Sequence, residues 1–178
     1  GGMANTFLHA DGLEVGASLC EPDFAATVAG IRAAARAAGC EIVLPADAVV
    51  AAKLAAGVPS TTVAIDAVPV DAMILDIGDR SVSRVTTLLD RSATLLWNGP
   101  VGAFEIAPFG EATFALAREA ARMTKRGTLV SVAGGGDTVA ALNAAGVAGD
   151  FTYVSTAGGA FLEYLEGRVL PGVAALAR

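Results

Sequence analysis

The sequence predicts an α/β fold with a mainly parallel sheet. Apolar, strand-like runs alternate with helix-like segments along the chain, and glycine-rich turns follow three of these runs. Such alternation is typical of right-handed βαβ units, in which each helix crosses between two parallel strands. The 178 residues suit one domain, or at most two small ones, and the 54% hydrophobic content excludes a disordered chain.

Elements of the first half are predicted from apolar spacing and from helix start and stop signals. A helix is expected at 22–38, because Pro22 and Asp23 are start signals and Gly39 is a stop signal. The other predictions for this half are a strand at 41–44, a strand or helix at 49–54, a strand at 61–66, a loop with an apolar end at 73–78 and a helix at 81–90.

Elements of the second half alternate more regularly. The run at 93–97 is apolar, as expected of a parallel strand that is covered on both faces. The segments after it are predicted to be a helix at 108–124, a strand at 128–133, a helix at 136–145, a strand at 151–155 and a helix at 158–166. We find no repeat and no linker, and we therefore predict one α/β domain.

Composition and charge exclude several classes of protein. The net charge of −6 argues against a nucleic-acid partner, which needs clustered Lys and Arg. The longest run without a charged residue, 92–104, is far shorter than the ~20 apolar residues of a membrane-spanning helix. Two cysteines and one histidine exclude a disulfide framework and a zinc site of the usual ligand count. The expected setting is reduced and cytoplasmic.

Three glycine-rich loops are the candidate binding elements. Each follows a predicted strand, and they lie at 97–105, 134–138 and 155–160. Because parallel strands end on the same side of a sheet, we expect the three loops at one rim. Open α/β sheets bind their ligands at such a rim.

The loop at 134–138 gives the clearest physical argument. Consecutive glycines let a backbone approach a ligand closely, and the following helix offers unpaired N–H groups and a positive dipole end to an anion. Asp137, in the first turn, suits either of two roles: it caps the helix, or it holds Mg²⁺. The string GGGDT matches neither the P-loop nor the dinucleotide fingerprint.

The other two loops give weaker signals. Asn98 offers a donor and acceptors at a strand end, and 99–100 is typical of a turn. Glu105 suits either the hydroxyls of a sugar or solvent. The amides of Gly158 and Gly159 suit either a second anion or a close strand–helix packing turn.

Together these segments resemble the C-terminal, nucleotide-binding domain of the phosphoglycerate kinase family. The resemblance rests on LLWNGPVGAFE at 95–105, AGGGDTVAAL at 133–142 and the segment 155–176, with shorter matches at 1–8, 15–19 and 73–78. It spans essentially the whole chain in the family's order. It implies a three-layer, Rossmann-like domain that is truncated at its N-terminus, because the family carries one more glycine before Gly1, at the end of a strand.

The resemblance implies a site for ATP or ADP with Mg²⁺. It implies an adenine slot at Gly1, Gly2, Leu19, Leu75, Pro100 and Ala103, with Glu105 on the ribose hydroxyls. It implies phosphate contacts from Asn98, Gly134, Gly135, Gly136, Asp137 and Thr138, with Asp137 on Mg²⁺. The amides of Gly158 and Gly159 would contact the transferring phosphoryl group. Ala157 stands where many family members have a third glycine, so this contact depends on the φ angle of Ala157.

The implied reaction is reversible phosphoryl transfer between 1,3-bisphosphoglycerate and ADP, which gives 3-phosphoglycerate and ATP in glycolysis. The family's domain that binds 3-phosphoglycerate, its catalytic arginine and a lysine loop would precede Gly1. We therefore expect the isolated chain to be inactive, and the parent enzyme to be a cytoplasmic monomer without nucleic-acid or membrane partners. The alternative is a non-catalytic α/β module that binds a nucleotide or a partner protein.

Overall fold

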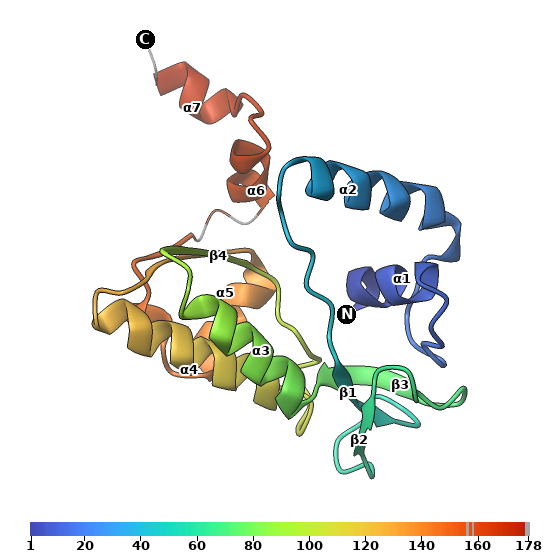
Figure 1. Cartoon of the computed structure of the whole chain (residues 1–178). Coiled ribbons are helices and arrows are strands. Elements are labelled where there is room, and N and C mark those ends of the chain that lie inside the picture. Colours follow the sequence, from blue (N-terminus) through green and yellow to red (C-terminus); the bar gives the residue numbers. More distant parts are fainter. Residues whose placement is uncertain (156, 158, 177–178) are drawn as a thin grey trace. The chain divides into compact units, whose positions relative to one another are not determined.

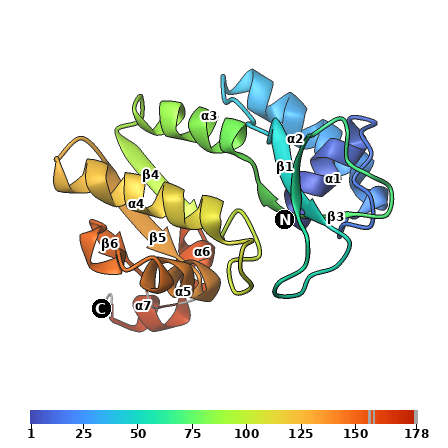
Figure 2. The same ribbon diagram turned by 90° about the horizontal axis from the view of Figure 1, so that it is seen from below.

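The computed structural model describes residues 1–155, 157 and 159–176, and contacts within the chain divide it into two compact units. Unit 1 comprises Gly1–Arg84 and Val101–Ala112, and unit 2 comprises Val85–Pro100 and Thr113–Arg178. Figures 1 and 2 show the helices and strands from two directions. The prediction that the chain is one partial nucleotide-binding domain stays a prediction.

Unit 1 opens with helices. They are α1 (Gly2–Ala10), the 3₁₀ turn η1 (Pro22–Phe24) and α2 (Ala25–Ala37). The helix predicted at 22–38 is confirmed, with the 3₁₀ turn at its start. Helices α1 and α2 lie side by side (Figure 1), and Phe7, Leu8 and Val28 are buried. The sequence analysis missed α1, which has Gly1 as its N-cap residue and no side-chain cap.

An antiparallel sheet follows in the same unit. Its strands are β1 (Asp47–Ala51), β2 (Thr61–Ala64) and β3 (Met73–Ile77), in the order β2-β1-β3. The strand predicted at 41–44 is wrong, because pairing begins only at Asp47, beyond Pro45, which has no N–H to donate. The loop predicted at 73–78 is also wrong, since it forms β3. The connections within this sheet are too short for the helical crossovers that parallel pairing needs.

The core of unit 1 lies on both faces of this sheet. One cluster comprises Ala48, Val50, Val68 and Ala72, and the other comprises Ala51, Leu75 and Phe109. Phe109 is fully buried and comes from the segment 101–112, which returns to unit 1 late in the sequence. This segment therefore packs against β1 and β3.

Unit 2 contains the parallel sheet. Its strands are β4 (Thr94–Asn98), β5 (Val130–Gly134) and β6 (Tyr153–Val154), in the order β4-β5-β6. The helices in this part of the chain are α3 (Asp79–Leu89), α4 (Glu111–Lys125), α5 (Gly136–Ala144), the 3₁₀ turn η2 (Ala148–Asp150), α6 (Gly159–Leu165) and α7 (Pro171–Leu176). Helices α3 and α4 each begin in unit 1. The predicted α/β fold with a parallel sheet is confirmed by these strands and helices.

One face of this sheet is covered, and the other is partly exposed. Figure 2 shows α4 beside the strands, and the hydroxyls of Thr124 on α4 and Ser131 on β5 are 2.7 Å apart. On the opposite face Leu96, Val130 and Tyr153 are each about half exposed. The expectation that the run at 93–97 is covered on both faces is therefore wrong for Leu96.

The last two helices complete the described chain. Helix α6 confirms the helix predicted at 158–166, and α7 was missed although it begins at Pro171, a favoured first residue of a helix. In the described ranges, every helix is too short or too polar to span a bilayer.

Candidate functional site

Within unit 1, the segment that ends at Leu19 lies beside both α1 and β3. The Leu19 side chain is 75% exposed and rests on Gly2, where an added Cβ would be 3.2 Å from Leu19 Cδ2. Asn5 Nδ2 donates a hydrogen bond to the Leu19 carbonyl at 3.0 Å, and the N–H of Ile74 donates to Ser18 Oγ at 2.8 Å. An exposed leucine is thus held in a fixed place by its backbone.

Within the same unit, Leu75 holds the loop that bears Ala103. The register between β1 and β3 shifts at Leu75, because Val49 pairs with Asp76 whereas Val50 pairs with Ile74. The Ala103 N–H donates to the Leu75 carbonyl at 2.9 Å. Bulges of this kind are frequent next to functional sites.

These contacts connect most of the predicted nucleoside-binding residues. Leu19 contacts Gly2, and its neighbour Ser18 is hydrogen-bonded to β3. On the same strand, the Leu75 carbonyl accepts a hydrogen bond from the Ala103 N–H. The Leu75 side chain is buried in the core, whereas Glu105 is exposed on the loop. Gly1 is exposed immediately before α1.

Within unit 2, the glycine loop follows β5 and faces the end of β4. Asn98 pairs with Gly134, and an added Cβ at Gly135 would lie 3.0 Å from Asn98 Oδ1. Gly135 has φ +94° and ψ 140°, a backbone conformation that is essentially restricted to glycine. The backbone of the loop therefore comes close to the Asn98 side chain.

The Gly99 peptide ties the two loops of unit 2 together. Its N–H donates to Thr138 Oγ1 at 2.6 Å, and its carbonyl accepts a hydrogen bond from Trp97 Nε1 at 2.7 Å. Both Trp97 and Thr138 are buried. The Gly99–Thr138 hydrogen bond joins residues 39 positions apart and was not predicted from the sequence.

Asp137 occupies the first turn of α5 with an exposed side chain. Helix α5 has Gly135 as its N-cap residue, so no side chain caps the helix from that position, and the capping interpretation of Asp137 stays a prediction. In the described part of the chain, no group of three or more His, Cys, Asp or Glu residues is placed to hold a metal ion. A lone exposed carboxylate fits Mg²⁺, which usually binds one or two carboxylates together with ligand phosphates.

The third glycine-rich loop is described only in part. Gly158 lies outside the described residues, and Gly159 begins α6. The Phe161 ring of α6 covers Gly134, where an added Cβ would be 2.1 Å from the ring. No non-glycine residue in the ranges 1–155 and 160–176 has a positive φ angle, and the φ angle of Ala157 depends on Thr156, which lies outside the described residues. The predicted amide contacts of Gly158 and Gly159 stay predictions.

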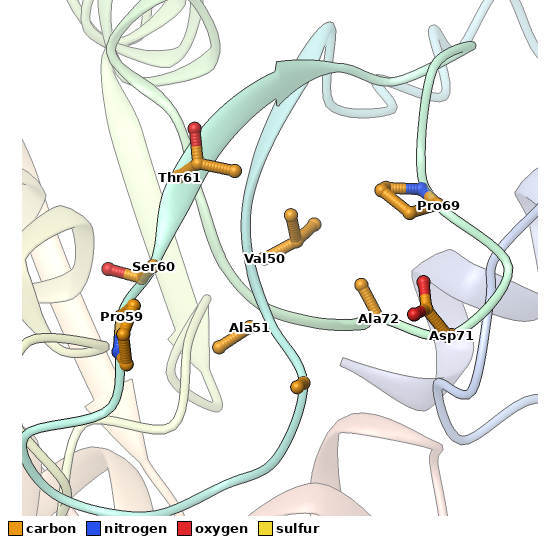
Figure 3. Close-up of a pocket in the computed structure, with 9 residues that line it drawn as sticks. Val50, Ala51, Pro59, Ser60, Thr61, Pro69, Asp71 and Ala72 are labelled. Carbon is orange, nitrogen blue, oxygen red and sulfur yellow. The ribbon is translucent and has the colours of Figure 1, made fainter.

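A hollow of about 240 Å³ lies elsewhere in unit 1, between β1, β2 and the turn before β3. Figure 3 shows its lining, which is mostly apolar and contains one carboxylate, Asp71. None of the residues predicted for the site contributes to this lining. The hollow therefore gives no support to the predicted site.

These features define a class of protein. A glycine loop follows a parallel strand and opens a helix, which is the arrangement that α/β proteins use for anionic ligands. The family model described as phosphoglycerate kinase matches residues 1–168. The chain therefore belongs to the phosphoglycerate kinase family.

Individual relatives agree with this assignment. The phosphoglycerate kinase of Methylobacterium radiotolerans is 65% identical over 176 residues, which are 99% of this chain and 44% of the relative. The phosphoglycerate kinase of Sinorhizobium fredii is 64% identical over 173 residues, which are 97% of this chain and 43% of the relative. The chain thus spans less than half the length of these relatives.

Solved structures of the family share the fold. The structure of phosphoglycerate kinase from Coxiella burnetii matches with a TM-score of 0.90 at 41% identity, over 98% of this chain and 44% of that one. The phosphoglycerate kinase from Pyrococcus horikoshii OT3 matches with a TM-score of 0.77 at 25% identity, over 97% of this chain and 42% of that one.

Neighbouring glycines give a matched test of the loop geometry. Gly135→Ala should lower the free energy of unfolding by about 1–3 kcal/mol, because alanine is strained at the φ of Gly135. Gly136→Ala should leave it unchanged or slightly raised, since no atom lies within 4 Å of the added Cβ and the residue is helical. Urea unfolding followed by circular dichroism measures both. An equal loss in the free energy of unfolding for both variants would contradict the backbone conformation of this loop.

Proposed function

We propose that this chain is the nucleotide-binding part of a phosphoglycerate kinase and binds ATP or ADP with Mg²⁺. The observation that carries the proposal is the loop 134–138, with Gly135 in a glycine-only conformation at the uncapped start of α5. The first turn of such a helix offers backbone N–H groups and a positive dipole end to phosphate. Membership of the family supports a nucleotide as the source of that phosphate.

The nucleoside is assigned to residues of unit 1, together with Pro100. Gly1, Gly2, Leu19, Leu75 and Ala103 line the proposed adenine slot, and Glu105 accepts hydrogen bonds from the ribose hydroxyls. The exposed Leu19 side chain on Gly2 supports this assignment, because apolar surface held beside a glycine suits the flat face of a base. Buried Leu75 contributes through its hold on Ala103.

The phosphates are assigned to residues of unit 2. Asn98, the amides of Gly134, Gly135 and Gly136, and Thr138 surround them in the proposal, and Asp137 holds Mg²⁺. The metal would supply positive charge that offsets the phosphate oxygens. The Thr138 hydroxyl already accepts the Gly99 N–H and donates to the ligand in this proposal. Gly158 and Gly159 present amides to the transferring group.

The proposed reaction is reversible transfer of a phosphoryl group between 1,3-bisphosphoglycerate and ADP. Phosphoryl transfer depends on positioning and on charge neutralisation, which are the tasks assigned to this chain's residues. In this proposal 3-phosphoglycerate binds to a part of the relatives that this chain does not span, and the enzyme acts as a monomer in the cytoplasm.

The role of Asp137 is tested by replacing only its charge. Asp137→Asn should weaken binding of ADP in the presence of Mg²⁺, while metal-free ADP should lose little affinity or gain some from reduced repulsion. Asp90→Asn is the matched control, because Asp90 is exposed in the same unit and has no role in the proposal. Calorimetric titration measures all four cases. Equal losses with and without Mg²⁺ would return Asp137 to a capping role.

The isolated chain should bind nucleotide without turning it over. The residues proposed here bind the nucleotide and the metal and make part of the phosphate contacts, but none of them is assigned to the acceptor substrate. A coupled assay with Mg-ATP and 3-phosphoglycerate should therefore show no turnover. A rate near 1 s⁻¹ or above, at the low end of usual enzyme rates, would contradict this division of roles.

A further inference from the structure

We propose that Asp76 is a positioning residue for the nucleoside half of the site. Its buried carboxylate fixes both ends of the loop 101–112 on β3, and so sets where Ala103 and Glu105 meet the ligand. The inference rests on the proposed function, because it assumes that this loop contacts adenine and ribose. The sequence analysis gave Asp76 no role.

The carboxylate anchors the far end of the loop. Asp76 is 2% exposed on β3, and its Oδ2 accepts a hydrogen bond from the Ala112 N–H at 3.1 Å. Ala112 lies in the first turn of α4, the helix into which the loop runs, and its N–H has no partner within the helix. Oδ1 accepts the N–H of Ile77 at 2.9 Å, which holds the carboxylate in its orientation.

The near end of the loop packs on the same carboxylate. An added Cβ at Gly102 would lie 2.2 Å from Asp76 Oδ1 and 2.4 Å from the Phe109 carbonyl oxygen, so only glycine fits there. The next residue, Ala103, donates its N–H to the carbonyl of Leu75, the residue before Asp76. Two consecutive residues of β3 thus hold the loop on either side of Glu105.

A carboxylate is a costly choice for this place. Burial raises the pKa of Asp76 to about 6. Hydrogen bonds from the N–H groups of Ala112 and Ile77 act in the opposite direction and lower this pKa. The charge of Glu111 also raises this pKa. Burying a charged group costs free energy that only well-placed donors recover. A carboxylate has two acceptor oxygens, so it can accept hydrogen bonds from the Ala112 and Ile77 N–H groups at the same time.

Asp47 provides a matched comparison within unit 1. It is 4% exposed on β1, and its two oxygens accept the N–H groups of Arg80 and Ser81 at 3.0 and 2.9 Å, at the start of α3. Burial acts to raise the pKa of Asp47, but the hydrogen bonds from Ser81 and Arg80 outweigh it and lower the pKa. Asp47 is therefore also a buried cap of a helix, but it holds no loop of the proposed site.

The test separates positioning from simple capping. Calorimetry measures the dissociation constants of adenosine and of pyrophosphate for the wild-type chain, Asp76→Asn and Asp47→Asn. We expect Asp76→Asn to raise the dissociation constant of adenosine roughly tenfold, which is the factor for one lost hydrogen bond to a charged acceptor. The dissociation constant of pyrophosphate should stay within about twofold of the wild-type value. Asp47→Asn should lower stability and leave both constants unchanged.

Each outcome decides the inference. Unchanged adenosine binding by Asp76→Asn, or equal weakening of both ligands, would overturn the role of Asp76 alone. A wild-type chain that binds neither ligand would overturn the proposed function and, with it, this inference. If Asp76→Asn does not fold, Gly102→Ala displaces the same loop without altering the carboxylate. The Gly102→Ala variant should bind adenosine more weakly and pyrophosphate as well as the wild type does. An unchanged dissociation constant for adenosine would then overturn the proposal.

Discussion

The backbone N–H groups at the start of a helix need acceptors, and this requirement organises much of the molecule. Helix α3 receives its acceptor from Asp47 on β1, and α4 receives its acceptor from Asp76 on β3. Both carboxylates are buried, and both come from strands rather than from the helix's own flanking residues. Helix α5 differs, because a glycine loop precedes it and no side chain caps it. The same physical requirement that fixes two helices thus leaves the start of the third suited to an external anion.

Glycine is required wherever these contacts are tightest. An added Cβ at Gly78 would lie 2.3 Å from Asp47 Oδ2, and one at Gly102 would lie 2.2 Å from Asp76 Oδ1. At Gly134 the close neighbour is the Phe161 ring, and at Gly135 it is Asn98 together with a positive φ angle. Glycines of the loop 134–138 therefore serve packing, a role that a sequence pattern alone does not separate from the proposed approach to a ligand.

Sequence patterns predicted the elements whose signals are local. The helix at 22–38 has its own start and stop residues, and the strands near 93–97 and 128–133 are short apolar runs between helices. Strand β3 was missed because it contains the charged residue Asp76, whose carboxylate is satisfied by the N–H groups of Ile77 and of the distant Ala112. The antiparallel pairing of β1 was missed because connection length, rather than residue type, decides it.

The candidate site was predictable to a similar extent. The loop at 134–138 is recognisable from its glycines and from the helix behind it, and the residues that the family's motifs imply for the nucleoside stay predictions. The Gly99 connection to Thr138 and the Asp76 contact with Ala112 were not predictable, because they join residues 39 and 36 positions apart. Such contacts depend on the packed fold and leave no local spacing in the sequence.

The central claim is that this chain binds a nucleotide through two separable sets of residues. The most direct measurement follows backbone amide chemical shifts in a ¹⁵N-labelled chain that is titrated with pyrophosphate and, separately, with adenosine. Pyrophosphate should shift the amides of 134–138, and adenosine should shift those of Leu19, Leu75 and Ala103. If pyrophosphate leaves the amides of 134–138 unmoved at saturating concentration, the start of α5 is not a phosphate site and the account is wrong.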